Sequence, residues 1–141
     1  MTFQVMLFDK AHTATGLMVN VVEEGVLFTG DIINNEYFSF MGHGNFKGAY
    51  EATLKALAMQ PKYVVVGHGQ SGEVGLINEF SHIYQKLRSL VKKYYEQGLM
   101  DYEMKPKILT AFDKYKYWSG FDSQIGRYIS QLNTEVENES F

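Results

Sequence analysis

Three residues in this chain combine a reactive or metal-binding side chain with a place at the end of an apolar run. His12 precedes one run, Asp31 follows another in the sequence TGD, and His68 lies in GHG after the run KYVVV. Imidazole and carboxylate groups are ligands of zinc, iron and manganese. Because the sequence has no Cys, disulfides and thiolate zinc sites are excluded, and a metal here needs His and carboxylate ligands.

The other two histidines have weaker patterns. His82 lies in a predicted helix beside its apolar stripe, which indicates a structural or solvent-exposed residue. His43 lies between two glycines in an aperiodic, aromatic loop over residues 32–46, and ordinary loop packing is the alternative to a role in a site. The loop residues that we expect at the lip of a substrate cleft are Tyr37, Phe38, Phe40 and His43.

Short apolar runs predict the strands that position these residues. Two of them flank the polar turn EEG and read as a hairpin, so His12 before it and Asp31 after it are expected at the same edge of a sheet. Glycines on both sides of His68 allow a sharp turn and the close approach of another group. The predicted strands are 3–8, 17–22, 26–29 and 62–66, of which the first and last are expected to be buried.

Helical spacing and stop signals predict the remaining elements. The expected helices are 47–59 before Pro61, a long helix from Glu73 to just before Gly98, one from about Pro106 to about Trp118, and one from about Gln124, capped by Asp122 or Ser123, into the acidic tail TEVENESF. The 141 residues, 45% of them hydrophobic, are sufficient for one α/β domain. We expect a sheet and site region over 1–72 and a helical tail over 73–141.

Charge and hydropathy narrow the classes of partner. The formal net charge of −3 gives no electrostatic reason to bind nucleic acid or an anionic membrane. No apolar run reaches the roughly 18 residues of a membrane span. The N-terminus has neither a basic start nor a small-residue cleavage site, so a cytoplasmic protein is expected.

The stretch HTATGLMVNVVEEGVLFTGD and the later VVVGHG resemble the C-terminal half of the metallo-β-lactamase fold superfamily. Members of that superfamily have a His-Thr before a hairpin, a strand that ends in Thr-Gly-Asp, and a late Gly-His-Gly after another strand. The resemblance covers about residues 1–100, and the C-terminal helices resemble the tail of hydrolase members. It implies an α/β fold that is half of an αβ/βα sandwich, with a mixed sheet, outer helices and a helical C-terminus.

The resemblance also implies roles for the three strand-end residues. His12 corresponds to a ligand of a first metal, His68 to a ligand of a second, and Asp31 to the catalytic carboxylate that bridges them. Zinc is the metal expected in the two sites, with iron or manganese as alternatives. Such metals turn bound water into a hydroxide nucleophile near neutral pH. The implied reaction is hydrolysis of an ester, thioester, lactam or phosphoester in a small-molecule substrate.

The sequence departs from the family pattern in one respect. The major ligand motif His-x-His-x-Asp-His, which lies upstream in the family, does not occur in these 141 residues. We therefore expect a fragment or truncated form of a metal-dependent hydrolase. Half of a sandwich leaves one sheet face uncovered as a large apolar patch. A second copy of the chain, or a separate N-terminal half, is expected to cover it.

Two other functions remain open from the sequence. A diiron redox protein of the flavodiiron type uses the same fold. A catalytically inactive remnant that serves only as an oligomerisation module would also account for the absent ligand motif.

Overall fold

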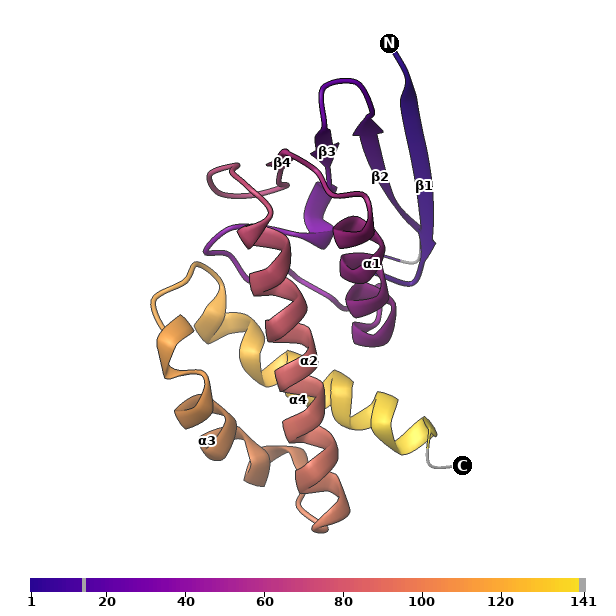
Figure 1. Cartoon of the computed structure of the whole chain (residues 1–141). Helices are drawn as coiled ribbons and strands as arrows, with labels where there is room; N and C mark the ends of the chain where they lie inside the picture. Colours follow the sequence, from indigo (N-terminus) through magenta and orange to yellow (C-terminus); the bar gives the residue numbers. More distant parts are fainter. Residues whose placement is uncertain (14, 140–141) are drawn as a thin grey trace.

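A computed structural model describes residues 1–13 and 15–139, without the side chain of Thr15, so the end of the predicted acidic tail lies outside the described residues. The strands form one four-stranded sheet in the order β1-β2-β3-β4 (Figure 1). Their bounds are Phe3–Asp9 for β1, Thr15–Val21 for β2, Val26–Phe28 for β3 and Tyr63–Val65 for β4. The first three strands pair antiparallel and β4 pairs parallel with β3, which confirms the predicted mixed sheet and the hairpin.

Helices cover one side of the sheet and form the lower half of the molecule in Figure 1, where α2 runs down the centre and α4 crosses it. A parallel pair of neighbouring strands needs a crossover, and the one between β3 and β4 contains the 3₁₀ turn η1 and α1. The helical bounds are Gly30–Ile32 for η1, Phe46–Ala58 for α1, Gly75–Glu96 for α2, Asp101–Ala111 for α3, Asp113–Tyr115 for the 3₁₀ turn η2 and Phe121–Glu139 for α4.

The first two helices match their predictions closely. In α1 the side chain of Asn45 caps the N-terminus by accepting a hydrogen bond from the Gly48 N–H, at 2.6 Å. The long helix α2 buries its predicted apolar stripe. It is followed by Gly98 at φ +80°, the left-handed conformation that glycine provides at a helix end.

The predictions for the last two helices were wrong at their starts. Helix α3 begins at Asp101, because the Glu103 carboxylate accepts a hydrogen bond from the Met100 N–H (2.7 Å) and caps the first turn. Pro106 therefore lies inside the helix rather than at its start, and the helix ends before the region of Trp118. Helix α4 begins at Phe121 rather than near Gln124, so Asp122 and Ser123 lie in its first turn instead of capping it.

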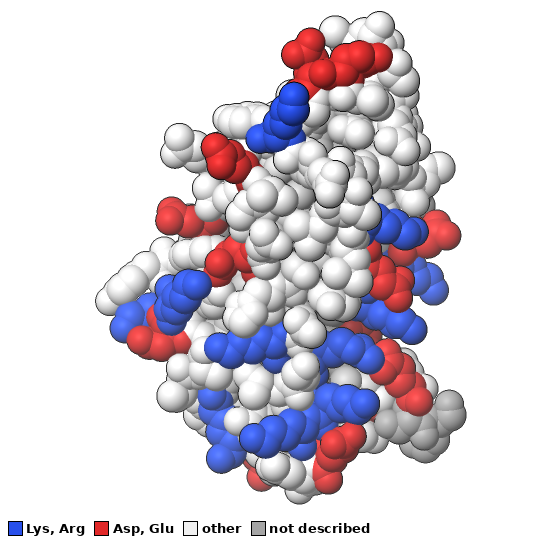
Figure 2. Space-filling model, viewed as in Figure 1, with Lys and Arg blue, Asp and Glu red and all other residues white. Residues whose placement is uncertain are grey.

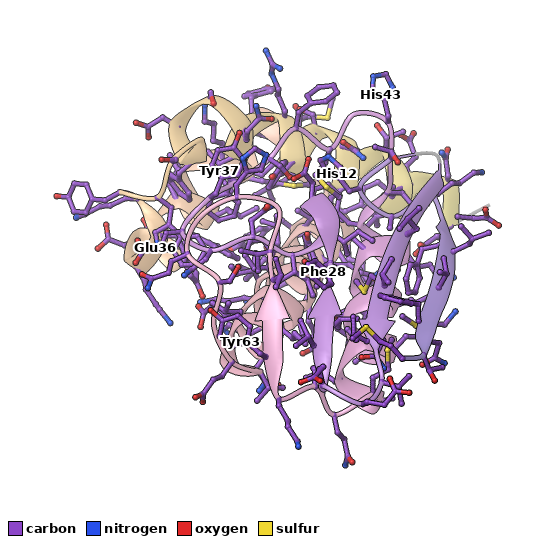
Figure 3. All side chains as sticks on the ribbon, turned by 90° about the horizontal axis from the view of Figure 1, so that it is seen from above. His12, Phe28, Glu36, Tyr37, His43 and Tyr63 are labelled. Atoms are coloured by element: carbon purple, nitrogen blue, oxygen red, sulfur yellow. The ribbon has the colours of Figure 1, made fainter. Side chains whose placement is uncertain are left out.

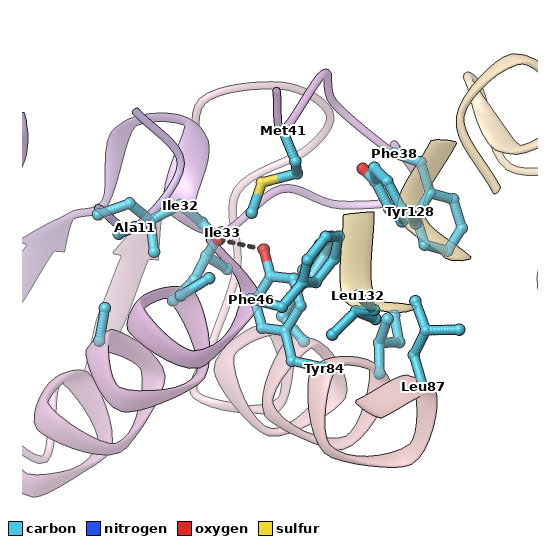
Figure 4. Packing of buried hydrophobic residues seen from close by; sticks show 14 of the residues in the cluster. Ala11, Ile32, Ile33, Phe38, Met41, Phe46, Tyr84, Leu87, Tyr128 and Leu132 are labelled. Carbon is cyan, nitrogen blue, oxygen red and sulfur yellow. Dashed lines mark hydrogen bonds between the residues drawn. The ribbon is translucent and has the colours of Figure 1, made fainter. Parts of the chain in front are cut away.

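The core lies between α1, α2 and α4 and continues under the sheet (Figure 4). Phe46 makes edge-to-face contacts with Tyr84 and Tyr128, at centroid distances of 6.0 and 5.0 Å. The Tyr84 hydroxyl donates a hydrogen bond to the Ile32 carbonyl (2.9 Å), so α2 is tied to the turn that follows β3. The helices thus fix the loop that contains Asp31.

Helices cover one face of the sheet and leave the other face exposed. Side chains such as Phe8 and Met18 point toward α1 and are buried. The opposite face is made of apolar side chains at alternate positions, and it is open. Large exposed side chains on this open face are Phe3 (59% exposed), Val5 (59%), Leu7 (68%), Leu17 (51%), Phe28 (44%) and Tyr63 (44%). The prediction that β1 is buried was therefore wrong, and Tyr63 shows that β4 is covered on one face only.

The open face predicts association. We expect the purified chain to sediment as a species larger than a single chain at micromolar concentration, because contiguous apolar patches of this size are rare on monomers. A Leu7→Lys substitution should shift it toward the single chain, whereas Leu54→Lys, at an equally apolar exposed site on α1, should not. A wild-type chain that sediments as a stable monomer would contradict this prediction.

The distribution of charge differs between the two halves. Lys and Arg gather across the lower, helical part in the view of Figure 2, and few lie over the upper part. Among the described residues, no helix combines the length and apolarity needed to cross a membrane.

One half-buried carboxyl joins the tail to α1. Glu135 on α4 accepts a hydrogen bond from the N–H of Phe46, the first residue of α1, at 2.8 Å. Its second oxygen is buried and has no hydrogen-bond partner among the described residues. Burial raises the pKa of this carboxyl to about 7, although the Phe46 N–H and the Arg88 charge act in the opposite direction.

This carboxyl predicts a pH-dependent stability. The folded chain holds the Glu135 proton above pH 4.5, the ordinary value, so its contribution is full below that pH and is lost as the pH rises to about 7. Glu135→Gln keeps an acceptor for Phe46 and does not ionise. We expect it to exceed the wild type in unfolding free energy above pH 7 by about 1–2 kcal/mol, a figure reduced for partial solvent screening, and to match it near pH 4. Urea unfolding across pH 4–8 measures the difference, with the exposed Glu137→Gln as control; equal pH profiles would contradict it.

Candidate functional site

Three strand ends meet at one edge of the sheet. Phe28 and Val65 are the last pair of the parallel strands β3 and β4, and Asp31 and His68 each follow their strand by three residues. His12 precedes the start of the antiparallel strand β2 by three residues. The register alone therefore sends all three side chains to the same edge.

The side chains converge on the Asp31 carboxylate. Its Oδ2 lies 3.5 Å from Nε2 of His12, and its Oδ1 lies 3.2 Å from Nε2 of His68. Figure 3 shows His12 beyond the end of the strands, above Phe28 and Tyr63. The expected meeting of the hairpin ends is confirmed, and each carboxylate oxygen faces a different imidazole.

Two glycines permit this approach. A Cβ on Gly67 would lie 2.2 Å from Oδ1 of Asp31 and 2.7 Å from the Gly30 carbonyl oxygen, so only glycine fits there. Gly69 has φ +86°, and a Cβ on it would lie 2.1 Å from the carbonyl oxygen of Asn35. The GHG sequence is thus a requirement of close packing between the two loops.

Asn34 and Ser39 orient the site, and the sequence pattern did not identify either. The Asn34 side chain, 1% exposed, donates to the Asp31 carbonyl (3.1 Å) and accepts from the His68 N–H (2.8 Å). Ser39 hydrogen-bonds Nδ1 of His12 (3.3 Å), which leaves Nε2 directed at Asp31. Both residues lie in the aperiodic loop, where no spacing indicates which polar side chains turn inward.

The environment of His12 favours a neutral ring. Burial lowers the pKa of its imidazole below the usual range, and the nearby His68 ring adds to this effect. The Asp31 carboxylate raises the pKa and offsets part of the shift. A neutral imidazole is the form that binds metals and accepts protons.

The four predicted lip residues separate into different environments. Tyr37 stacks on His68, with ring centroids 4.2 Å apart and planes at 19°. Phe40 is 47% exposed and meets the exposed His43 edge to face at 5.4 Å. Phe38 is 2% exposed and packs against aromatic side chains of the helical tail, so it lies in the core rather than at a lip. His82 is exposed on α2 and does not belong to this group of residues.

The side chains of His12, Asp31 and His68 are of types that bind metals, but the three do not complete a metal site. Two imidazoles and one carboxylate are ligand types for zinc, iron and manganese. However, no group of three or more His, Cys, Asp or Glu among the described residues could hold a metal ion by itself. The three residues form two pairs that share Asp31, so in this chain alone they do not fit a complete metal site.

Comparison with solved structures identifies the fold. VMB-1 aligns with 60% of this chain and 41% of its own, at 23% identity and a TM-score of 0.55. The metallo-β-lactamase from Pontibacter korlensis aligns with 59% of this chain and 41% of its own, at 20% identity and a TM-score of 0.55. DIM-1 aligns with 60% of this chain and 42% of its own, at 19% identity and a TM-score of 0.55. This part of the chain has the metallo-β-lactamase fold.

The metallo-β-lactamase fold agrees with the predicted fold class of a mixed sheet with outer helices. The chain spans about two fifths of the length of the solved proteins that it matches. No model of a protein family matches the sequence, and neither does a curated protein sequence. The likeness therefore establishes the fold, and the chemistry depends on the residues described above.

Asn34 provides a test of how the metallo-β-lactamase fold holds this site together. We expect Asn34→Ala to lower the free energy of unfolding by about 1–3 kcal/mol, because it removes two part-buried hydrogen bonds that join the Asp31 carbonyl and the His68 N–H. Chemical denaturation of this variant and of Asn78→Ala, an exposed position on α2, measures the effect. A loss no greater than that of Asn78→Ala would show that Asn34 does not join the two loops.

Proposed function

We propose that this chain carries part of the active site of a metal-dependent hydrolase with the metallo-β-lactamase fold. One observation supports the proposal above the others: each oxygen of Asp31 faces the Nε2 atom of a different imidazole, at 3.5 and 3.2 Å. A carboxylate placed between two imidazole donors is suited to bridge two metal ions. The fold of the similar structures supports the same assignment.

In this proposal Asp31 bridges two metal positions, His12 serves one and His68 the other. Zinc is the proposed metal, with iron or manganese as alternatives of the same donor preference. When bound, such a metal would lower the pKa of a water molecule and supply a hydroxide near neutral pH. The proposed reaction is hydrolysis of an ester, thioester, lactam or phosphoester of a small molecule, and Tyr37, Phe40 and His43 lie beside the site to contact it.

The remaining ligands must come from outside these residues, because Asp31 and its two histidines do not close a site. We propose that a partner, either a segment equivalent to the N-terminal half or a second copy, covers the open face of the sheet. The site lies at the edge of that face, where β2 begins and β3 and β4 end. One partner could therefore both bury the apolar side chains and complete the ligand set.

The two alternative functions have different support. Two of the similar structures reported above, DIM-1 and the protein from Pontibacter korlensis, are metallo-β-lactamases by name, and they give no support to a diiron redox protein. An inactive oligomerisation module is compatible with the open face, and it predicts that Asp31 has no role in metal binding. Metal binding thus separates it from the proposed hydrolase.

Zinc titration by calorimetry tests the proposal. We expect the wild-type chain, in complex with the partner that supplies the remaining ligands, to bind zinc, and Asp31→Asn to lower the affinity by about tenfold or more, because this change weakens the ligand shared by both pairs. His68→Ala should also weaken binding. His82→Ala is the matched control, since His82 is exposed on α2.

The outcomes separate the two candidate functions. Zinc affinity that is the same in Asp31→Asn and His82→Ala would refute the metal-binding role and favour the inactive module. If Asp31→Asn does weaken binding, the complex purified with its partner should hydrolyse a chromogenic ester, lactam or phosphodiester, and should lose that activity with the same substitution.

A further inference from the structure

A groove lies beside the candidate metal ligands and contains none of them. It consists of two hollows of about 320 and 340 Å³ that share Asn35 and Glu36. The first hollow extends toward α2 and Trp118, and the second toward Tyr37 and Ser119. We call the two together the Glu36 groove. Figure 3 shows Glu36 and Tyr37 near each other, on the side of the molecule away from His43.

One wall of the Glu36 groove is apolar and held rigidly. Leu76, Phe80 and Trp118 line the first hollow. Trp118 packs against Tyr115 and Phe80, with centroids at 4.7 and 6.1 Å, so its ring has a fixed orientation. An indole ring with Leu76 and Phe80 beside it suits the apolar part of a ligand.

The charged side chains that line the groove are Glu36, Glu79 and Lys114. The Glu79 carboxylate is already engaged, since it receives Lys114 Nζ at 3.1 Å and the Tyr115 hydroxyl. Glu36 is exposed, and its carboxylate has no ion pair with any side chain that the structure describes. One unbalanced negative charge therefore remains on the rim common to both hollows.

The backbone holds Glu36 in place at a cost. Its φ of +52° lies in the left-handed region, which is strained for a residue other than glycine. The Ser119 N–H donates to the Glu36 carbonyl (3.0 Å), and the Phe38 N–H donates to the Ser119 carbonyl (2.8 Å). The tail thus clamps the loop in a conformation that keeps this carboxylate at the rim of the groove.

We propose that the Glu36 groove binds an organic ammonium ligand, with its apolar part against Trp118 and its protonated amine at Glu36. A free carboxylate attracts an ammonium group and repels an anion, and a hydrogen bond to a charged group is stronger than one between neutral groups. The single acceptor charge beside an apolar wall distinguishes an amine from an alcohol or an acid of equal length.

The place of this groove also bears on the reaction proposed above, and that link rests on the proposed function. Tyr37 lines the second hollow and stacks on His68. A ligand that extends from Trp118 past Tyr37 would reach the candidate metal ligands. The distal end of the hydrolysed substrate would then be an amine-bearing apolar group.

Trp118 makes the groove directly observable, because it is the single tryptophan in the sequence. Titration with pentylamine at pH 7, in a buffer without amines and with EDTA present, should change the tryptophan emission to saturation. Pentanoate and pentan-1-ol should bind about fivefold more weakly. Glu36→Gln should weaken pentylamine binding by about fivefold and remove the preference over pentan-1-ol. Glu24→Gln, exposed on the β2–β3 turn, is the matched control and should bind as the wild type does.

Several results would overturn the proposal. These are a linear change in emission without saturation, equal binding of pentanoate, or a Glu36→Gln variant that still prefers the amine. Circular dichroism of both variants checks that they are folded. Since EDTA removes free metal, binding in this assay does not depend on the metal site. The groove can therefore fail while the zinc titration succeeds, and the reverse is equally distinguishable.

Discussion

The parallel pairing of β3 with β4 is the constraint on which the rest of this structure depends. It sets Phe28 opposite Val65, so two loops leave the sheet at the same level and cross three residues later at Asp31 and His68. The crossing is close enough to require Gly67, and Asn34 fixes it by bonding to both loops. Because the register determines the position of the site, a shift of either strand would separate the carboxylate from the imidazole.

The sequence predicts those features that depend on local periodicity or on strand order. The apolar stripe of α2 and the hairpin before Asp31 are examples, since each has a repeat and a terminating glycine. Features decided by tertiary contacts were not predictable in this way. The start of α3 is a different case, because its signal is local: Pro106 suggests a helix start, but the Glu103 cap sets it earlier. Phe38 lies in an aromatic loop that suggests a cleft, but its side chain packs among the aromatic side chains of the helical tail.

The sheet face is uncovered and the set of candidate ligands is incomplete for the same physical reason. Apolar side chains at alternate positions of β1, β2 and β3 are suited to pack on another sheet, and the candidate ligands lie along the edge of that same surface. Burial of the face would also remove water from one side of Asp31, which would strengthen its electrostatic interactions with cations. Association and metal binding are therefore expected to be coupled in this chain.

The helical tail takes part in the site although the sequence suggests a division near residue 72. The Tyr128 hydroxyl donates to the Ser39 carbonyl, and Ser39 in turn bonds to His12. The Gln131 amide donates to the Met41 and Gly44 carbonyls, at 3.0 and 3.1 Å. Because the loop over residues 32–46 does not belong to the sheet, these hydrogen bonds supply partners for its backbone carbonyls. The tail thus fixes the orientation of a candidate ligand through Tyr128 of α4, and it fixes the strained residue at the rim of the groove through Ser119.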